Sequence, residues 1–132
     1  MITGLAHVAL VASDMQKSLD FYCGALGLTH AFSIPREDGT PWIEYLKICP
    51  GQFLELFYAE PGHVPAGRSH AHLCLQVDDV RAAAAALEAA GIALRDVPRQ
   101  GRDKNWQCWV DDPDGHRIEL MQIDPASPQA LA

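Results

Sequence analysis

The sequence predicts a single domain of mixed helices and strands, built from two copies of one strand–helix–strand module. The segment HVALVASDM, which begins at His7, matches HLCLQVDDV, which begins at His72, at an offset of 65 residues. Each segment leads into a helical pattern that ends at a glycine. Each half then closes on a strand with a central glutamate, FLELFY at Glu55 and RIELMQ at Glu119. Repetition at a fixed period indicates a duplicated structural unit.

The spacing within the two halves is nearly equal. The histidine precedes the glutamate by 48 residues in the first half and by 47 in the second, so one deletion accounts for the difference. We therefore expect modules over about residues 4–60 and 70–123, joined by the Pro- and Gly-containing stretch 61–67. The tail 124–132, which holds prolines and small residues, is expected to fray.

Eight segments rich in branched and aromatic residues are expected as strands. They are residues 5–12, 28–35, 41–48, 53–59, 72–78, 93–97, 105–111 and 116–123. The sequences EDGT (Glu37–Thr40) and DPDG (Asp112–Gly115) are typical of hairpin turns. Asp14 is expected to cap the first helix.

The second helix is predicted from an alanine-rich run, Arg81–Glu88, whose residues favour helix formation. Asp78 or Asp79 is its expected N-cap, and Gly91 its terminator.

Composition excludes several classes of protein. The 132 residues are 48% hydrophobic and 20% charged, which is ordinary for one globular domain. No apolar run approaches the ~20 residues of a membrane span, and the N-terminus lacks the features of a signal peptide, so we expect a cytoplasmic protein without a membrane partner. The net charge of −7 argues against nucleic acid as a partner. The four cysteines include no closely spaced pair, so reduced thiols are expected.

The repeated histidines and glutamates fall on one face of their strands. Side chains alternate across a strand, and the opposite face is aliphatic in all four segments. The residues expected to share the faces of His7, Glu55, His72 and Glu119 are Ala9, Val11, Phe53, Phe57, Cys74, Gln76, Arg117 and Met121. Carboxylates in a partly apolar setting are costly unless they are paired or bind a metal. Two imidazoles and two carboxylates suit a divalent cation, so these four residues are the predicted metal ligands.

A single histidine or glutamate on a strand is more often solvated than functional, and the duplicated placement of all four reverses that judgement. His70 is the main rival ligand because it lies two residues before His72. The repeat selects His72, since His70 aligns with Leu5. The histidines without a counterpart are interpreted as surface or turn residues: His30, His63 and His116.

These motifs resemble the vicinal oxygen chelate (VOC) superfamily, the glyoxalase, bleomycin-resistance and dioxygenase group, over roughly residues 4–123. HVALVASDMQKSLDFYCGALGL looks like the opening strand and helix of the family. HLCLQVDD looks like the start of its second module, and DPDGHRIELMQ like its closing hairpin and strand. The resemblance implies an α+β fold in which two βαβββ modules form an open, eight-stranded barrel-like sheet around the site.

The ligand pattern is similar to that of glyoxalase I. Fosfomycin-resistance transferases and extradiol dioxygenases have three ligands, without a glutamate at the position of Glu55. Bleomycin-binding members lack the metal ligands. The expected cofactor is one divalent ion: zinc, nickel or cobalt, with iron or manganese as alternatives. This chain departs from glyoxalase I at two positions that hold glutathione in that family. Val11 stands where glyoxalase I has an arginine, and Ala59 where it has an asparagine. The substrate is therefore expected not to be a glutathione adduct.

The predicted chemistry is proton transfer of the isomerase or lyase type on a small substrate with vicinal oxygens. The metal would act as a Lewis acid, and Glu119 would move the proton, with Glu55 as its symmetric counterpart. The candidate substrate contacts are Arg117, Phe53, Phe57, Met121, Trp106, Arg102 and Lys104. A solvated loop explains the last two equally well, and core packing explains the aromatic residues.

Two alternatives stay open at this point. One is a metal-dependent dioxygenase of the same superfamily, and the other is a non-catalytic protein that binds a small molecule such as a drug. The resemblance also implies a homodimer, with sites formed within one chain or across the interface.

Overall fold

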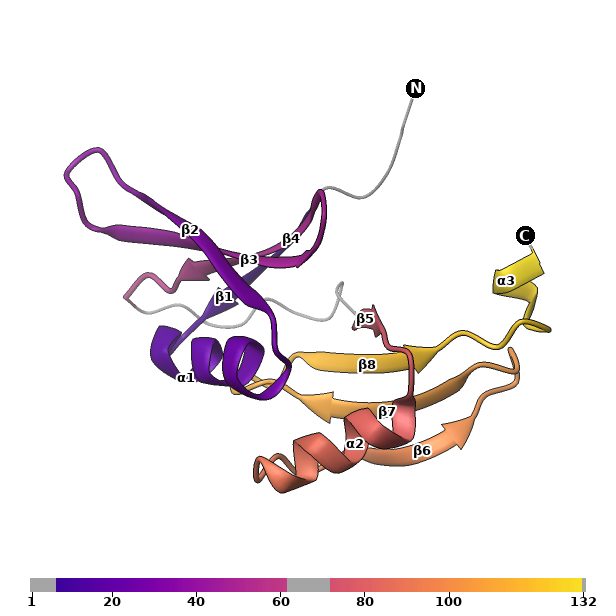
Figure 1. Ribbon diagram of the computed structural model, residues 1–132. Helices are drawn as coiled ribbons and strands as arrows, with labels where there is room; N and C mark the ends of the chain where they lie inside the picture. The colour runs from indigo at the N-terminus through magenta and orange to yellow at the C-terminus, as the bar shows by residue number, and fades with distance from the viewer. Residues whose placement is uncertain (1–6, 62–71, 132) are drawn as a thin grey trace. The chain divides into compact units, whose positions relative to one another are not determined.

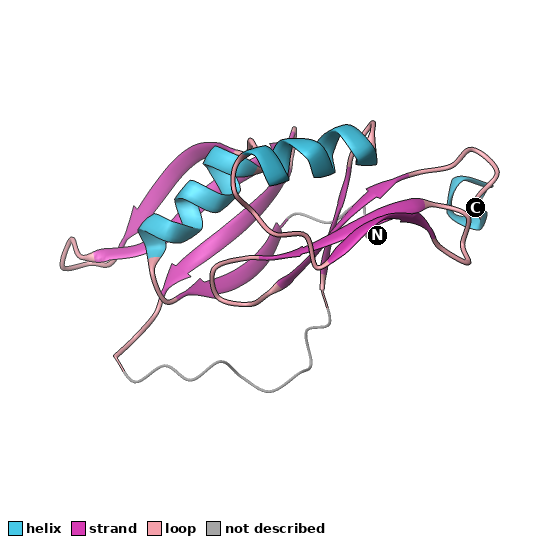
Figure 2. Cartoon of the chain, turned by 90° about the horizontal axis from the view of Figure 1, so that it is seen from below, coloured by secondary structure: helices cyan, strands magenta, loops and turns pink. Residues whose placement is uncertain are grey.

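The computed structural model describes residues 7–61 and 72–131 of the chain. They form two four-stranded sheets with helices (Figures 1 and 2). The strands are β1 (His7–Ala12), β2 (Thr29–Pro35), β3 (Pro41–Cys49), β4 (Gln52–Tyr58), β5 (Leu73–Gln76), β6 (Asp96–Gln100), β7 (Trp106–Asp111) and β8 (Arg117–Gln122). The helices are α1 (Met15–Leu19), η1 (Asp20–Ala25), α2 (Val80–Ala89) and α3 (Pro128–Leu131). The chain divides into two compact units, Met1–Pro65 and Ala66–Ala132.

Both units have the predicted βαβββ connectivity. The strand order is β1-β4-β3-β2 in the first unit and β5-β8-β7-β6 in the second. In each unit the first strand is parallel to the last, and the remaining neighbours are antiparallel. The α+β fold class expected from the sequence is thereby confirmed for each module, and the duplication extends to the pairing of every strand.

The aliphatic faces predicted from the repeat are buried. In the second unit, α2 lies against β6, β7 and β8, and its Val80, Ala84 and Leu87 are buried. The buried apolar side chains of these faces are Leu10, Ala12, Leu46, Leu54 and Leu56 in the first unit, and Leu73, Leu75, Cys108, Val110, Ile118 and Leu120 in the second. Burial of one face leaves the other face of each sheet to carry the histidine and the glutamate.

The first helix differs from a regular α-helix. Asp14 is its N-cap, as predicted, and accepts a hydrogen bond from the amide of Lys17 at 3.2 Å. After one turn the chain widens into the π-helix η1, in which the amide of Leu26 bonds to the carbonyl of Phe21 at 2.9 Å. Gly27 follows with φ 73°, a left-handed conformation suited to glycine, and ends the helix. Periodicity does not distinguish this widened turn from an α-helical one.

Asp79, the second of the two candidates, caps α2 and accepts hydrogen bonds from the amides of Arg81 and Ala82 at 2.9 and 3.0 Å. Gly91, with φ 79°, follows this helix, as expected. None of the helices in the described parts of the chain is long and apolar enough to span a membrane.

One expectation about a strand was wrong. The strand expected over 93–97 is Asp96–Gln100, because the Arg95 amide already bonds to the Trp109 carbonyl at 2.7 Å and the ladder continues from there. Within the tail, Pro128–Leu131 is a short helix, preceded by Ser127, which is fully buried. Most of the expected linker 61–67 lies outside the described residues, as do His63 and His70.

Candidate functional site

The first unit places His7 beside Glu55. Because Ala9 pairs with Glu55 between parallel strands β1 and β4, His7 lies two residues away on the same face. His7 Nδ1 is 3.5 Å from Glu55 Oε1. Glu55 is 5% exposed, whereas His7 lies at the exposed start of β1. A nearly buried carboxylate with an accessible imidazole is thus formed by two strands that are distant in sequence.

The second unit repeats this arrangement. Cys74 pairs with Glu119 between β5 and β8, and His72 lies two residues before Cys74. His72 Nε2 is 3.2 Å from Glu119 Oε2, and Glu119 is also 5% exposed. The repeated histidine and glutamate are therefore brought together within each unit.

The neighbouring strand supplies an aromatic residue to each pair, and the sequence analysis missed both. Tyr45 is the register partner of Glu55, and Trp109 is the register partner of Glu119. The ring of Tyr45 meets the His7 ring edge-on at a centroid distance of 6.4 Å. Trp109 meets His72 in the same way at 4.9 Å. The offset of 64 residues that relates the glutamates also relates these two residues, and this signal could have found them.

The polar groups of these aromatic residues are used differently. The Tyr45 hydroxyl donates a hydrogen bond to Glu55, and this bond is the main reason that the pKa of Tyr45 is raised. Trp109 instead donates its indole N–H to Gln107 Oε1 at 2.8 Å. Glu55 therefore has a phenol donor that the residue at the equivalent position does not supply to Glu119.

The Cys74 thiol lies close to Glu119. Desolvation of the thiol raises its pKa to about 12, and the Glu119 charge, a hydrogen bond to Glu119 and the Asp103 charge act in the same direction. Cys74 is therefore a neutral thiol near neutral pH and a weak hydrogen-bond donor.

The candidate substrate contacts divide between the two faces of their sheets. Phe53 and Phe57 have the same strand parity as Glu55, and Arg117 and Met121 have that of Glu119, as expected. Trp106 does not: it lies on the same face as Cys108 and Val110, which α2 covers, and the Arg81 guanidinium of α2 is 4.7 Å from its ring centroid. Trp106 is therefore placed away from the face of Glu119, because strand alternation assigns it to the opposite side.

Arg102 and Lys104 lie exposed in the loop between β6 and β7. The Lys104 backbone has φ 71°. Its carbonyl accepts a hydrogen bond from the side-chain Nε2 of Gln100 at 2.8 Å. Neighbouring Asn105 is buried and donates to Asp103 Oδ2 at 2.8 Å and to the Met121 sulfur at 3.4 Å. Asn105 thus anchors the loop on Met121, whereas Arg102 and Lys104 are exposed.

The donor set fits a divalent cation in its chemistry. Each unit supplies one imidazole and one nearly buried carboxylate, the ligand types that zinc, nickel and cobalt accept. Within residues 7–61 and 72–131, no group of three or more His, Cys, Asp or Glu side chains lies together in a metal-binding arrangement. Each unit, taken by itself, brings together one imidazole and one carboxylate.

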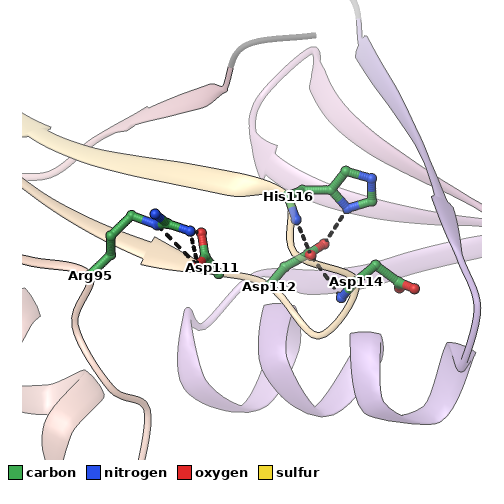
Figure 3. Close-up of polar contacts among 5 residues, drawn as sticks. All are labelled: Arg95, Asp111, Asp112, Asp114 and His116. Carbon is green, nitrogen blue, oxygen red and sulfur yellow. Dashed lines mark hydrogen bonds and ion pairs between the residues drawn. The ribbon is translucent and has the colours of Figure 1, made fainter. Parts of the chain in front are cut away.

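The closing hairpin of the second unit is held by the carboxylate of Asp112 (Figure 3). Its Oδ1 accepts hydrogen bonds from the amides of Asp114 and His116 at 2.9 and 2.8 Å. Its Oδ2 lies 2.8 Å from His116 Nδ1, and this bond is the main reason that the pKa of His116 is raised. Arg95 donates hydrogen bonds from two guanidinium nitrogens to the carboxylate of neighbouring Asp111. This turn leads directly into β8 and so positions the strand that carries Glu119.

A second polar cluster lies on the buried face of the first unit. Glu44 is 8% exposed and interacts with His30 Nε2 at 2.6 Å and with the hydroxyls of Ser33 and Tyr58. Burial opposes ionisation of Glu44, but these hydrogen bonds outweigh it and lower its pKa. His30 is thus exposed, as predicted, yet it lies within a strand and is paired with a carboxylate.

The profile of the Glyoxalase/Bleomycin resistance protein/Dioxygenase superfamily matches residues 4–120. The chain is similar to protein YaeR of Escherichia coli K12, with 31% identity over 88% of this chain and 93% of YaeR. It is also similar to lactoylglutathione lyase of Pseudomonas putida, with 28% identity over 90% of this chain and 84% of that protein.

Among solved structures, the fold is similar to that of TnmS3, an antibiotic binding protein from Streptomyces sp. CB03234. The TM-score is 0.76 with 29% identity, and the match covers 93% of this chain and 98% of TnmS3.

Proposed function

Because the chain belongs to the Glyoxalase/Bleomycin resistance protein/Dioxygenase superfamily, we propose that it is a glyoxalase I-like metalloenzyme acting by proton transfer on a small substrate with vicinal oxygens. The observation that carries this proposal is the duplicated His–Glu pair. The two pairs occupy the same register positions in two sheets, and both carboxylates are nearly buried. The similarity to a lactoylglutathione lyase supports the same reaction class.

His7, Glu55, His72 and Glu119 are the proposed ligands of one divalent metal ion. Zinc, nickel or cobalt suits this mixture of nitrogen and oxygen donors, with iron or manganese as alternatives. When bound, such an ion supplies Lewis-acid stabilisation to an oxyanion that develops on the substrate. The proposed assembly is a homodimer, with the ligand set completed in one chain or across two.

The proton is proposed to move through Glu119. A base must release its other interactions in order to reach the substrate. The Tyr45 phenol donates to Glu55, whereas Glu119 has the weaker Cys74 thiol as its donor and the Trp109 indole is directed to Gln107. This asymmetry favours Glu55 as the fixed ligand and Glu119 as the carboxylate that takes a proton from one carbon and returns it to the next.

The substrate is proposed not to be a glutathione adduct. Val11 and Ala59 replace the arginine and asparagine that hold glutathione in glyoxalase I. Neither side chain can hydrogen-bond to a peptide or a carboxylate. Arg117, on the face of Glu119, is the proposed contact for an anionic substrate group, and Phe53, Phe57 and Met121 are the proposed apolar contacts.

The test measures metal content and proton exchange on the purified protein and on two variants. Glu55→Gln is expected to lose stoichiometric metal, whereas Glu119→Gln is expected to keep metal and to lose exchange of solvent deuterium into hydroxyacetone. Glu88→Gln, an exposed glutamate on α2, is the matched control and is expected to change neither quantity. Absence of metal from the wild-type protein, or unchanged exchange in Glu119→Gln, would contradict the proposal.

A second candidate function is non-catalytic binding of a small molecule, and the similarity to an antibiotic binding protein favours it. It predicts tight ligand binding that is independent of metal. The third candidate, a metal-dependent dioxygenase, predicts oxygen consumption with a catechol. Metal analysis and an oxygen electrode separate the three functions.

A further inference from the structure

Three aromatic side chains lie together next to the His7–Glu55 pair. Phe32 stacks on Tyr45 with ring centroids 4.4 Å apart and an interplanar angle of 19°. Phe53 meets both rings edge-on, at 6.2 Å from Phe32 and 6.1 Å from Tyr45. Tyr45 also contacts His7 and Glu55. We call Phe32, Tyr45 and Phe53 the aromatic platform. It extends across β2, β3 and β4 of the first sheet (Figure 1).

The platform leaves part of its surface uncovered within its own unit. Phe32 is 45% exposed on the edge strand β2, and Tyr45 and Phe53 are half-buried. Cross-strand aromatic contacts stabilise a sheet, which accounts for the stacking of Tyr45 on Phe32. It does not account for keeping a large exposed ring close to a histidine and a buried carboxylate.

The equivalent positions of the second sheet show whether the fold requires aromatic residues at the platform. Asp96 pairs with Trp109 as Phe32 pairs with Tyr45. Arg117 precedes Glu119 by two residues on β8, as Phe53 precedes Glu55 on β4. The same sheet therefore forms with an aspartate and an arginine at the positions of Phe32 and Phe53. Of the three platform positions, that of Tyr45 is aromatic in both halves, as Trp109 in the second, whereas those of Phe32 and Phe53 are aromatic in the first half alone and are not required to be so by the fold.

The polarity of this face restricts its ligand. The platform lies on the same face of the first sheet as His7 and Glu55. Among the residues that the structure describes, Lys47, which pairs with Phe53, is the other charged residue on that face. Flat aromatic surfaces bind planar rings by offset stacking or edge contacts. The combination suits a ring that carries few charges of its own.

We propose that the aromatic platform binds a planar aromatic ring that the substrate carries directly beside its two chelating oxygens. This inference rests on the proposed metal site of His7, Glu55, His72 and Glu119, and it names the substrate class. The exposed ring of Phe32 is the specificity-determining contact, because Tyr45 also holds Glu55 and Phe53 is partly covered.

The test uses three hydroxamates that chelate zinc through the same two oxygens. Benzohydroxamate carries a planar ring, cyclohexanecarbohydroxamate a saturated ring of similar size, and acetohydroxamate no ring. Calorimetry on the full-length, zinc-loaded protein measures the three affinities. The wild type is expected to prefer the planar over the saturated ring by about fivefold, the range of one aromatic contact.

Two substitutions at one exposed position decide the role of the ring. Phe32→Leu is expected to reduce the preference to below about twofold, whereas Phe32→Tyr keeps a ring and is expected to retain it. Acetohydroxamate affinity and zinc content are expected to stay the same in both variants.

The outcomes separate this inference from the proposed function. Stoichiometric zinc with equal affinity for both ring hydroxamates, or a preference that Phe32→Leu leaves intact, would overturn the inference alone. Failure of the wild-type protein to bind zinc would overturn the proposed function and this inference with it.

Discussion

Tyr45 and Trp109 occupy equivalent positions in the two sheets, each opposite a buried glutamate, but only Tyr45 directs its polar group to that glutamate. The duplicated module is therefore symmetric in its proposed metal ligands and asymmetric in the side chains that hydrogen-bond to them. Residues that hydrogen-bond to metal ligands orient them and alter metal affinity.

The first prediction concerns this support. Tyr45→Phe removes the hydroxyl that bonds to Glu55 and keeps the ring, so zinc affinity is expected to fall by about tenfold. Competition with a chromophoric chelator measures the change. Tyr58→Phe is the matched control, because the Tyr58 hydroxyl donates to Glu44 at 3.0 Å and not to Glu55. Equal zinc affinity in both variants would show that the Tyr45 hydroxyl does not help Glu55 to bind zinc.

The second prediction concerns the turn that precedes β8. Asp112 is 6% exposed and accepts two backbone hydrogen bonds. Asp112→Ala leaves both amides without this partner and is expected to lower the free energy of unfolding by about 2 kcal/mol. Urea denaturation measures it. Asp112→Asn keeps one carbonyl acceptor and is expected to lose less than the alanine variant.

The third prediction is a pH dependence of stability. The pKa of His116 is raised, chiefly by its hydrogen bond to Asp112. The folded state therefore binds the proton more tightly, and the stabilisation is fully present below the ordinary pKa of histidine. It is lost as the pH rises through the raised value.

The comparison that tests this sign is between wild type and His116→Gln. The difference in unfolding free energy is expected to be about 1 kcal/mol larger at about pH 5.5 than at about pH 8.5. In an Asp112→Asn background the pH dependence of that difference is expected to disappear. A difference that grows toward alkaline pH would contradict the assignment.

The fourth prediction compares two glycines at the end of the first helix. Gly27 has φ 73°, which an alanine adopts at a cost, so Gly27→Ala is expected to destabilise the protein by about 1 kcal/mol. Gly24, which lies in η1, does not have a positive φ, and a methyl group there meets no atom within 4 Å. Gly24→Ala is expected to be neutral or slightly stabilising. Thermal unfolding distinguishes the two variants.

The sequence predicted the βαβββ modules, and it singled out the repeated histidines and glutamates, because the duplication appears in residue identity. It also predicted the helix cap Asp14, Asp79 as one of two candidate caps, and the turn at Asp112–Gly115, since each depends on a short local motif. These features need no knowledge of which strands are neighbours.

Other features depend on pairing between distant segments and were not predicted. Phe32 has no counterpart that the repeat could identify by residue type, because Asp96 stands at the equivalent position. Trp106 was expected among the substrate contacts, but its face is decided by the position of α2. The start of β6 was misplaced because the pairing begins at the Arg95–Trp109 hydrogen bond.

The parallel pairing of the first and last strands has a consequence for folding. His7 and Glu55, like His72 and Glu119, belong to opposite ends of their modules and become neighbours only when the outermost strand joins the sheet. Contacts between segments that are distant in sequence tend to slow folding, because the entropy of loop closure must be overcome before they form. A cation bound by the histidine and the glutamate would therefore stabilise the pairing of the first and last strands of the module. Metal affinity and folding stability would then be linked.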